Sequence, residues 1–87
     1  MIRTEPTRAF LRAYKRLPDR IQQAADQKIR LFSRFPHHPS LRLKRVGGAE
    51  TLWEISVNMQ YRVVMRCLAE DHYELLAIGT HRALDVH

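Results

Sequence analysis

The spacing of apolar residues changes once along the chain, and this change restricts the possible folds more than any other feature. Up to Phe35 the apolar residues recur every three or four positions, as they do on one face of an amphipathic helix. From Leu41 onward they alternate with polar residues, which is typical of strands with one buried face. A short chain with both patterns in this order predicts an α+β fold in which helices precede a sheet.

Two helices are expected before the change in spacing. The first covers residues 7–17 and the second 19–35, and their apolar stripes consist of Phe10, Leu11, Tyr14 and Leu17, and of Ile21, Ala25, Ile29 and Phe32. Leu-Pro-Asp separates the two segments, and Pro18 suits the first position of the second helix. The pattern predicts a helical hairpin, with room for a short strand over residues 2–5 before it.

Strands are expected after the hairpin, because Pro-His-His-Pro at 36–39 ends helical geometry. Alternation runs through residues 41–44, 53–57 and 61–67, and the segment 73–78 is apolar on both faces, as in a strand inside a sheet. Gly47-Gly48, Asn58-Met59 and Glu70-Asp71 supply turns. The prediction is an N-terminal helical hairpin packed on one face of a twisted antiparallel sheet of about four strands, in a single domain over residues 1–87.

Positive charge is concentrated in the first part of the chain. Residues 1–48 contain twelve Lys and Arg against three acids, whereas residues 49–87 contain three against six. Twelve of the fifteen basic residues are arginines, whose planar guanidinium matches phosphate and carboxylate groups well. The implied partner is a nucleic acid or an acidic protein, and composition alone does not choose between them.

The sequence also limits the environment and the ligands of the protein. Cys67 is the single cysteine, so a disulfide framework and a Cys-x-x-Cys metal site are excluded. The segment MIRTEPTRAF lacks the apolar core of a signal peptide, and no apolar run reaches the ~18 residues of a membrane span. No spacing among the five histidines brings three metal ligands together. We therefore expect a cytoplasmic protein that uses no membrane, metal or cofactor.

Four segments in this order resemble the RelE/ParE toxins of bacterial toxin–antitoxin systems, over nearly the whole chain. MIRTEPTRAFLRAYKRLP is similar to the opening strand and helix of that family, and LRLKRVGG to its basic strand. LWEISVNMQYRVVMR resembles its most characteristic stretch, and IGTHRALD the Gly-Thr-His ending of YafQ-like members. The resemblance implies a toxin that cleaves messenger RNA on the translating ribosome without a metal, inhibits translation, and is held by a cognate antitoxin protein.

The resemblance and the chemistry of RNA together indicate catalytic residues. RNA carries its own nucleophile, a 2′-hydroxyl, so an enzyme must move protons and stabilise charge at phosphorus. His81, the histidine of Gly-Thr-His, is the predicted acid or base, and Arg62 is the predicted clamp for the transition state. The competing interpretations are a surface histidine in a short loop and a strand arginine paired with Glu54 or Glu74.

Further basic residues are predicted to hold the RNA. Lys44 is predicted to belong to the catalytic group. It shares a predicted strand face with Arg42 and lies next to Arg45, so these side chains are expected to contact RNA phosphates. The alternative is a basic face that is only solvated. The remaining predicted contacts are Arg66, Arg82 and His87. Asp85 departs from the aromatic residue expected after Gly-Thr-His in YafQ-like toxins, which places base stacking there, and activity, in doubt.

Other aromatic and imidazole side chains are assigned away from the site. Trp53, Tyr61 and Phe32 are expected in the core because of their periodicity. At most one of His37 and His38 is expected to join a site, since neighbours in an extended loop point to opposite sides.

Three other functions share the sequence features. A ParE-like inhibitor of DNA gyrase has the same fold and needs no catalytic residue, and a degenerate toxin acts only as a binding module. A noncatalytic RNA-binding domain is weakened by the lack of exposed aromatics on the strands. A basic stripe on the first helix, Arg8, Arg12 and Arg16, is either a solvated face or a surface for ribosomal RNA or an acidic antitoxin segment.

Overall fold

A computed structural model describes residues 1–48 and 50–84 and confirms the α+β fold. Along the chain the elements are β1 (Arg3–Pro6), α1 (Arg8–Lys15), α2 (Asp19–Arg34), a 3-10 helix η1 (Pro39–Leu41), β2 (Lys44–Arg45), β3 (Leu52–Ser56), β4 (Tyr61–Ala69), β5 (His72–Thr80) and α3 (His81–Leu84). Within the described ranges, no helix is long and apolar enough to cross a membrane.

The sheet has five strands in the order β1-β5-β4-β3-β2. The pairs β5–β4, β4–β3 and β3–β2 are antiparallel, as predicted, and β5 lies inside the sheet with a neighbour on each side. The expectation of about four antiparallel strands was wrong in one respect, because β1 pairs with β5 in parallel. Four residues, RTEP, carry no alternating pattern, so nothing local in the sequence indicates the partner or the direction of this strand.

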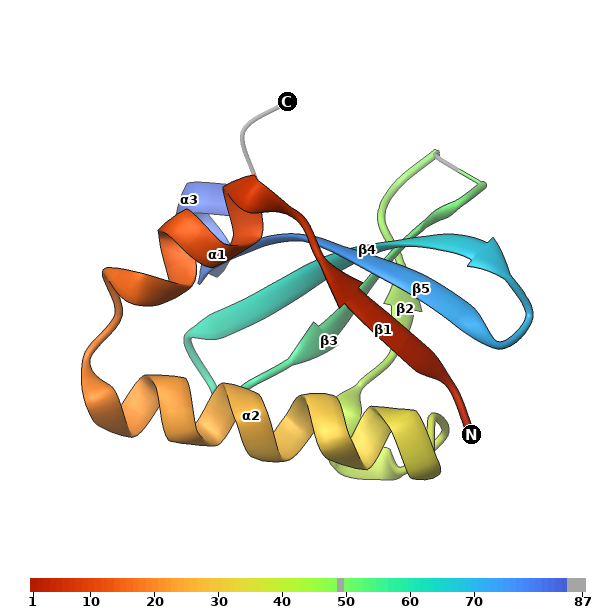
Figure 1. Cartoon of the computed structure of the whole chain (residues 1–87), viewed down its shortest axis with the longest axis horizontal. Coiled ribbons are helices and arrows are strands. Elements are labelled where there is room, and N and C mark those ends of the chain that lie inside the picture. Colours follow the sequence, from red (N-terminus) through yellow and green to blue (C-terminus); the bar gives the residue numbers. More distant parts are fainter. Residues whose placement is uncertain (49, 85–87) are drawn as a thin grey trace.

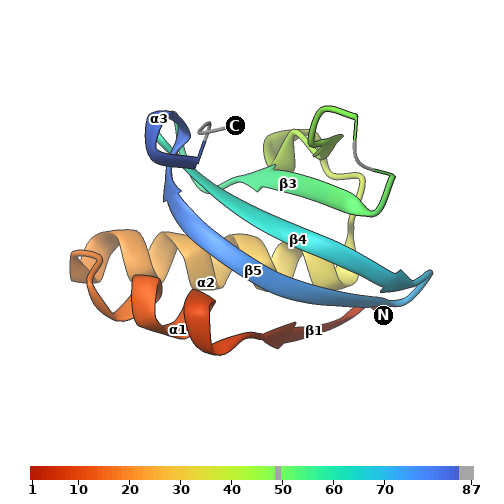
Figure 2. The same ribbon diagram turned by 90° about the horizontal axis from the view of Figure 1, so that it is seen from above.

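Both long helices cover the same face of the sheet, with α2 running across it and α1 near the β1 edge (Figures 1 and 2). The first helix begins at Thr7, whose hydroxyl oxygen accepts the Phe10 N–H at 3.1 Å and donates to the Leu75 carbonyl of β5 at 2.9 Å. The hairpin is fastened by the Tyr14 hydroxyl, which donates to the Asp26 carboxylate at 2.9 Å. Partial burial and this carboxylate raise the pKa of Tyr14 above 10.0.

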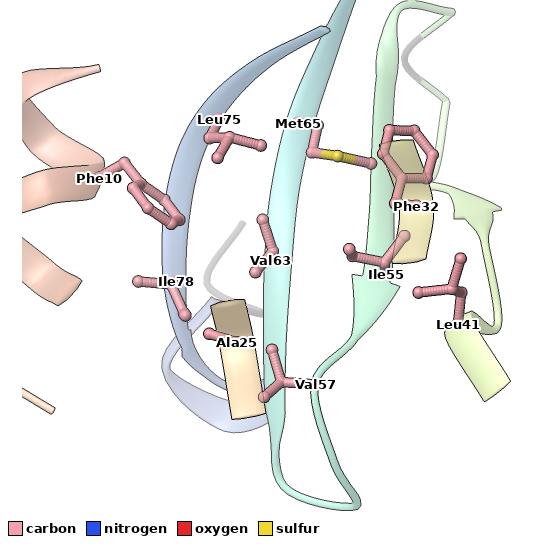
Figure 3. Packing of buried hydrophobic residues seen from close by; sticks show 10 residues of the cluster. All are labelled: Phe10, Ala25, Phe32, Leu41, Ile55, Val57, Val63, Met65, Leu75 and Ile78. Atoms are coloured by element: carbon pink, nitrogen blue, oxygen red, sulfur yellow. The ribbon is translucent and has the colours of Figure 1, made fainter. Parts of the chain in front are cut away.

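The core lies between this helical layer and the sheet (Figure 3). Its buried side chains come from α1, α2, η1 and the three central strands: Phe10, Ala25, Phe32, Leu41, Ile55, Val57, Val63, Met65, Leu75 and Ile78. The predicted stripe of α2 is confirmed at Ile21, Ala25 and Phe32. On α1, however, Leu11 is 41% exposed, because only Phe10 of this short helix points fully into the core.

The predicted strand over residues 41–44 is largely replaced by a 3-10 turn. The ring nitrogen Nδ1 of His38 accepts the Ser40 N–H at 3.2 Å, and Pro39 favours the start of the turn. Leu41 is thereby folded into the core, and Arg42 adopts a left-handed backbone with φ 48°. Strand pairing begins only at Lys44, so Arg42 and Lys44 do not share a strand face as the alternation predicts.

The other face of the sheet, which α1 and α2 leave uncovered, is referred to below as the open face. It presents the side chains of alternate residues in β3 and β4 that point away from the core, namely Glu54, Arg62, Val64 and Arg66. The short helix α3 turns over this side, opposite α2 (Figure 2). Where the sequence predicts a loop after Gly79, β5 instead continues to Thr80 and leads directly into α3.

Candidate functional site

A shallow groove of about 110 Å³ opens between the edge strand β2, the open face of β3 and β4, and helix α3. Its walls are formed by side chains and backbone from four separate parts of the chain: Lys44, Arg45, Val46, Gly47, Glu54, Arg62, Val64, His81 and Leu84. Four residues predicted from the sequence therefore meet in one place, although Lys44 and His81 are far apart in the chain. The hydrophobic residues Val64 and Leu84 form its apolar part.

The remaining predicted RNA contacts do not line this groove. Arg66 lies farther along β4 and pairs with Glu74 of β5 at 3.6 Å. Arg82 is exposed on α3, and Arg42 lies beside a different hollow together with His37 and His38. His87 and Asp85 lie outside the described residues.

The guanidinium of Arg62 is held by the turn between β3 and β4. Its Nη1 donates to the Asn58 carbonyl at 2.8 Å and to the carbonyl of Tyr61 at 3.1 Å. The bonds that fix it use Nη1, so within the described part of the chain Nη2 and Nε keep their donor capacity. Neither Glu54 nor Glu74 is the partner of Arg62, because these carboxylates pair with Lys44 and Arg66. The alternative of a carboxylate-paired strand arginine is therefore wrong.

His81 owes its position to the end of β5. Its backbone N–H donates to the Gln60 carbonyl at 2.9 Å, which ties the start of α3 to the β3–β4 turn. The Thr80 hydroxyl oxygen accepts the Ala83 N–H at 3.2 Å and so caps the first turn of α3. Gly79 of β5 pairs with Arg62 of β4, so the end of β5 brings the His81 imidazole and the Arg62 guanidinium to the same groove. His81 itself is exposed, as the alternative of a surface histidine also requires.

Glu54 is a groove residue that the sequence reasoning assigned only as an ion partner. Its carboxylate lies 3.4 Å from Nζ of Lys44, and its side chain is only 13% exposed, against 63% for Lys44. Alternation along β3 places Glu54 on the same face as the arginines of the open face, so the sequence pattern could have predicted Glu54 at this groove. The pair brings both an anchored ammonium group and a carboxylate into the groove.

The groove is suited to bind an anion next to a side chain, His81, that can transfer a proton. Two cationic side chains, Lys44 and Arg62, face one carboxylate, so the lining keeps a positive excess. In residues 1–48 and 50–84, no three His, Cys, Asp or Glu side chains gather as ligands of a metal ion would.

The fold is the one seen in solved structures of RelE/ParE toxins. YafQ from E. coli superposes with a TM-score of 0.79 over 99% of this chain and 100% of YafQ, at 13% sequence identity. A YoeB/ParE toxin from Agrobacterium tumefaciens gives 0.74 over 92% of this chain and 99% of the toxin, at 18% identity. A RelB–RelE antitoxin–toxin complex from Methanococcus jannaschii gives 0.72 over 95% and 98%, at 15% identity.

These likenesses confirm the RelE/ParE-like fold that the sequence predicts. No protein-family model and no curated protein matches the sequence. At such low identities the superpositions establish the architecture alone. They do not establish the activity.

Proposed function

We propose that this protein is the toxin of a toxin–antitoxin pair and that it cleaves messenger RNA on the translating ribosome in the cytoplasm. The observation that carries this proposal is the meeting of His81, Arg62 and Lys44 in one groove on the open face. Each comes from a different element, and none of them is needed there to fill the core. A histidine in the same groove as two cations can supply the proton transfer and the charge stabilisation that RNA cleavage through the 2′-hydroxyl needs.

Each groove residue has a distinct part in the proposed reaction. The 2′-hydroxyl attacks the adjacent phosphorus and the 5′-oxygen of the next nucleotide leaves, giving a 2′,3′-cyclic phosphate. His81 transfers a proton to or from one of these oxygens, since its imidazole can act as acid or base near neutral pH. Arg62, fixed through Nη1, offers Nη2 and Nε to the phosphate oxygens whose charge grows in the transition state.

Lys44 and Glu54 complete the site. The ion pair holds the Lys44 ammonium at the groove edge, where it contacts a phosphate of the bound strand. Because the groove side chains supply both proton transfer and charge stabilisation, the proposed reaction uses no metal or cofactor. Arg45 follows Lys44 at the sheet edge, where its guanidinium carbon lies 5.6 Å from the centre of the Trp53 ring.

The proposed partner that controls the toxin is an acidic antitoxin. Solved structures with the same fold include complexes of RelE with RelB and of YafQ with DinJ. The chain itself has a formal net charge of +6, which favours a partner segment rich in Asp and Glu. Neutralising the groove in this way blocks access of RNA.

The test is induction of the chain in bacteria without its antitoxin, followed by mapping of new RNA ends. Wild-type protein is expected to arrest growth and to create ends within translated frames, whereas His81→Ala and Arg62→Ala create none. Arg30→Ala is the matched control for Arg62→Ala, because it removes an exposed arginine of α2 that lies outside the groove. Arrest without RNA cleavage but with DNA-damage signalling supports the gyrase inhibitor instead, and no arrest supports a protein that only binds.

A further inference from the structure

A second hollow, of about 530 Å³, lies on the helix-covered side of the sheet, beyond the end of α2. Its residues come from the loop after α2, from η1 and from two strands: His37, His38, Pro39, Arg42, Leu43, Trp53 and Tyr73. This volume falls within the range of sites that hold a small ligand, roughly 300–1,000 Å³. The proposed reaction makes no use of any of these residues.

The floor of the hollow is aromatic. Trp53 was expected to be a core residue, but it is only half-buried and presents part of its indole to the hollow. Tyr73, on the other side of β4, lines the same hollow and is fixed edge-to-face against Phe32 at a centroid distance of 5.0 Å. A half-buried tryptophan in the wall of a hollow offers a surface on which a planar ring can stack.

The rim of the hollow carries hydrogen-bond donors. Arg42 projects from a backbone with φ 48°, which turns the chain at this point and separates Arg42 from the β2 side chains. The Nδ1 atom of His38 accepts the Ser40 N–H at 3.2 Å, so in the neutral ring the proton resides on Nε2, which is a donor. An arginine and an imidazole N–H at the rim of an aromatic floor match a phosphate attached to a nucleoside.

Strand β2 connects this hollow with the groove. Successive side chains of a strand point to opposite faces, and Lys44 pairs with Glu54 on the open face. Arg45 contributes to the groove lining, and its guanidinium carbon also lies 5.6 Å from the centre of the Trp53 ring. Because β2 is the edge strand of the sheet, a nucleic acid chain can pass over it from one site to the other.

We propose that the hollow binds one unpaired nucleotide of the RNA strand that occupies the groove. The base stacks against Trp53, with Tyr73 lining the other side of the hollow, and its phosphate is held by Arg42 and His38. The strand crosses the sheet edge over Lys44 and Arg45. The identity of the bound strand as RNA rests on the proposed function. The proposal also gives Arg42, which lies outside the groove, the RNA contact that the sequence predicts.

Trp53 makes the proposal directly measurable, because it is the single tryptophan of the chain. The probe is a single-stranded RNA hexanucleotide with 2′-O-methyl groups, which cannot be cleaved. Its binding to the wild-type chain is followed both by Trp53 emission and by the anisotropy of a label on the probe. A matched abasic oligonucleotide carries the same phosphates without bases. The intact probe is expected to change Trp53 emission at saturation, and the abasic probe to bind without that change.

Variants separate the hollow from the groove. Arg42→Asn removes the charge and suits the left-handed backbone, and it is expected to weaken binding of the intact probe about five- to tenfold. Arg8→Asn removes an equal charge from α1 and is the control, with a change below about twofold. In Arg62→Gln the affinity falls while the emission change at saturation remains, because the hollow is intact.

The proposal is overturned if Trp53 emission stays unchanged at saturating probe, or if the intact and abasic probes give equal responses. It is also overturned if the affinity of Arg42→Asn for the probe equals that of Arg8→Asn. An emission change produced by an acidic peptide and not by RNA likewise overturns it in favour of a protein-binding hollow. These measurements are independent of cleavage. A protein that stacks the base but cuts no RNA retains the hollow and loses only the proposed activity.

Discussion

The guanidinium of Arg62 and the carbonyl of Asn58 are joined by a hydrogen bond of 2.8 Å, so the charge in the groove is fixed by the turn that precedes it. The Asn58 side chain organises the same turn, since its Oδ1 accepts the N–H groups of Gln60 and Tyr61, both at 2.8 Å. Gln60 in turn accepts the His81 N–H. One asparagine thus sets the relative position of the two residues proposed to act on RNA.

Asn58→Ala is therefore expected to impair the site, although Asn58 itself does not contact the substrate. Loss of the two hydrogen bonds accepted by Oδ1 lowers the free energy of unfolding by about 1–2 kcal/mol, measured by urea denaturation. RNA cleavage falls more than RNA affinity, because Arg62 and His81 lose their alignment. Asn58→Asp keeps the acceptor oxygen and is expected to retain most of the stability; a variant as unstable as Asn58→Ala contradicts this role of the turn.

Lys44→Gln is expected to weaken RNA binding without relaxing any sequence preference. A lysine that contacts a phosphate releases about one counterion, so the slope of log affinity against log salt falls by up to one. The measurement is a salt titration of binding to an uncleavable RNA. Lys15→Gln, on the exposed end of α1, is the control. Equal slopes for the two variants contradict a phosphate contact at Lys44.

Tyr73 is expected to make the protein sensitive to alkali. Burial, and then the neighbouring Cys67, raise the pKa of its phenol from 10.0 to about 12. Below pH 10 the phenol is protonated in both the folded and the unfolded chain, so it has no effect on stability there. Between pH 10 and 12 only the unfolded chain loses the proton, which favours unfolding. Urea denaturation between pH 9 and 11 is expected to show a steeper loss for the wild type than for Tyr73→Phe; parallel losses contradict the shift.

A pair of leucines tests the packing. Leu41 of η1 is fully buried, whereas Leu11 of α1 is 41% exposed. Leu41→Ala is expected to reduce the free energy of unfolding by about 2–5 kcal/mol, because it leaves a cavity in the core. Leu11→Ala is expected to change it by less than about 1 kcal/mol. Denaturant unfolding of the two variants distinguishes this packing from the sequence-based prediction, in which Leu11 is buried on the stripe of the first helix and Leu41 in a strand.

Periodicity predicted the helical hairpin and the three long strands because their apolar faces are set by burial, which leaves a direct trace in sequence. It was misled at Leu41, where an apolar residue is buried by a 3-10 turn that pattern alone cannot distinguish from a strand. The parallel partner of β1 was likewise unpredictable, since pairing of the first strand with the last depends on the whole topology. Helix α3 is too short for a periodic signal.

Prediction of the site rested on separate arguments. The Gly-Thr-His motif pointed to His81 and strand alternation to Arg62 and Lys44; the structure lines one groove with these residues, and their roles stay predictions. Glu54 was missed because its ion pair depends on the register between β2 and β3. Trp53 was assigned to the core because alternation tells which face a residue occupies, but not whether a helix extends far enough to cover it.

The parallel pairing of β1 with β5 also governs when the sheet can be completed. Arg3 and His72 are neighbours in the sheet, although almost the whole chain separates them. Such a distant contact slows folding, since the intervening loop must close before the pairing stabilises it. As the polypeptide is synthesised, β1 stays without its partner until β5 has been made, and His81 directly follows β5. Under the proposed function, a nascent chain therefore lacks a completed groove, and an antitoxin needs to capture only finished molecules.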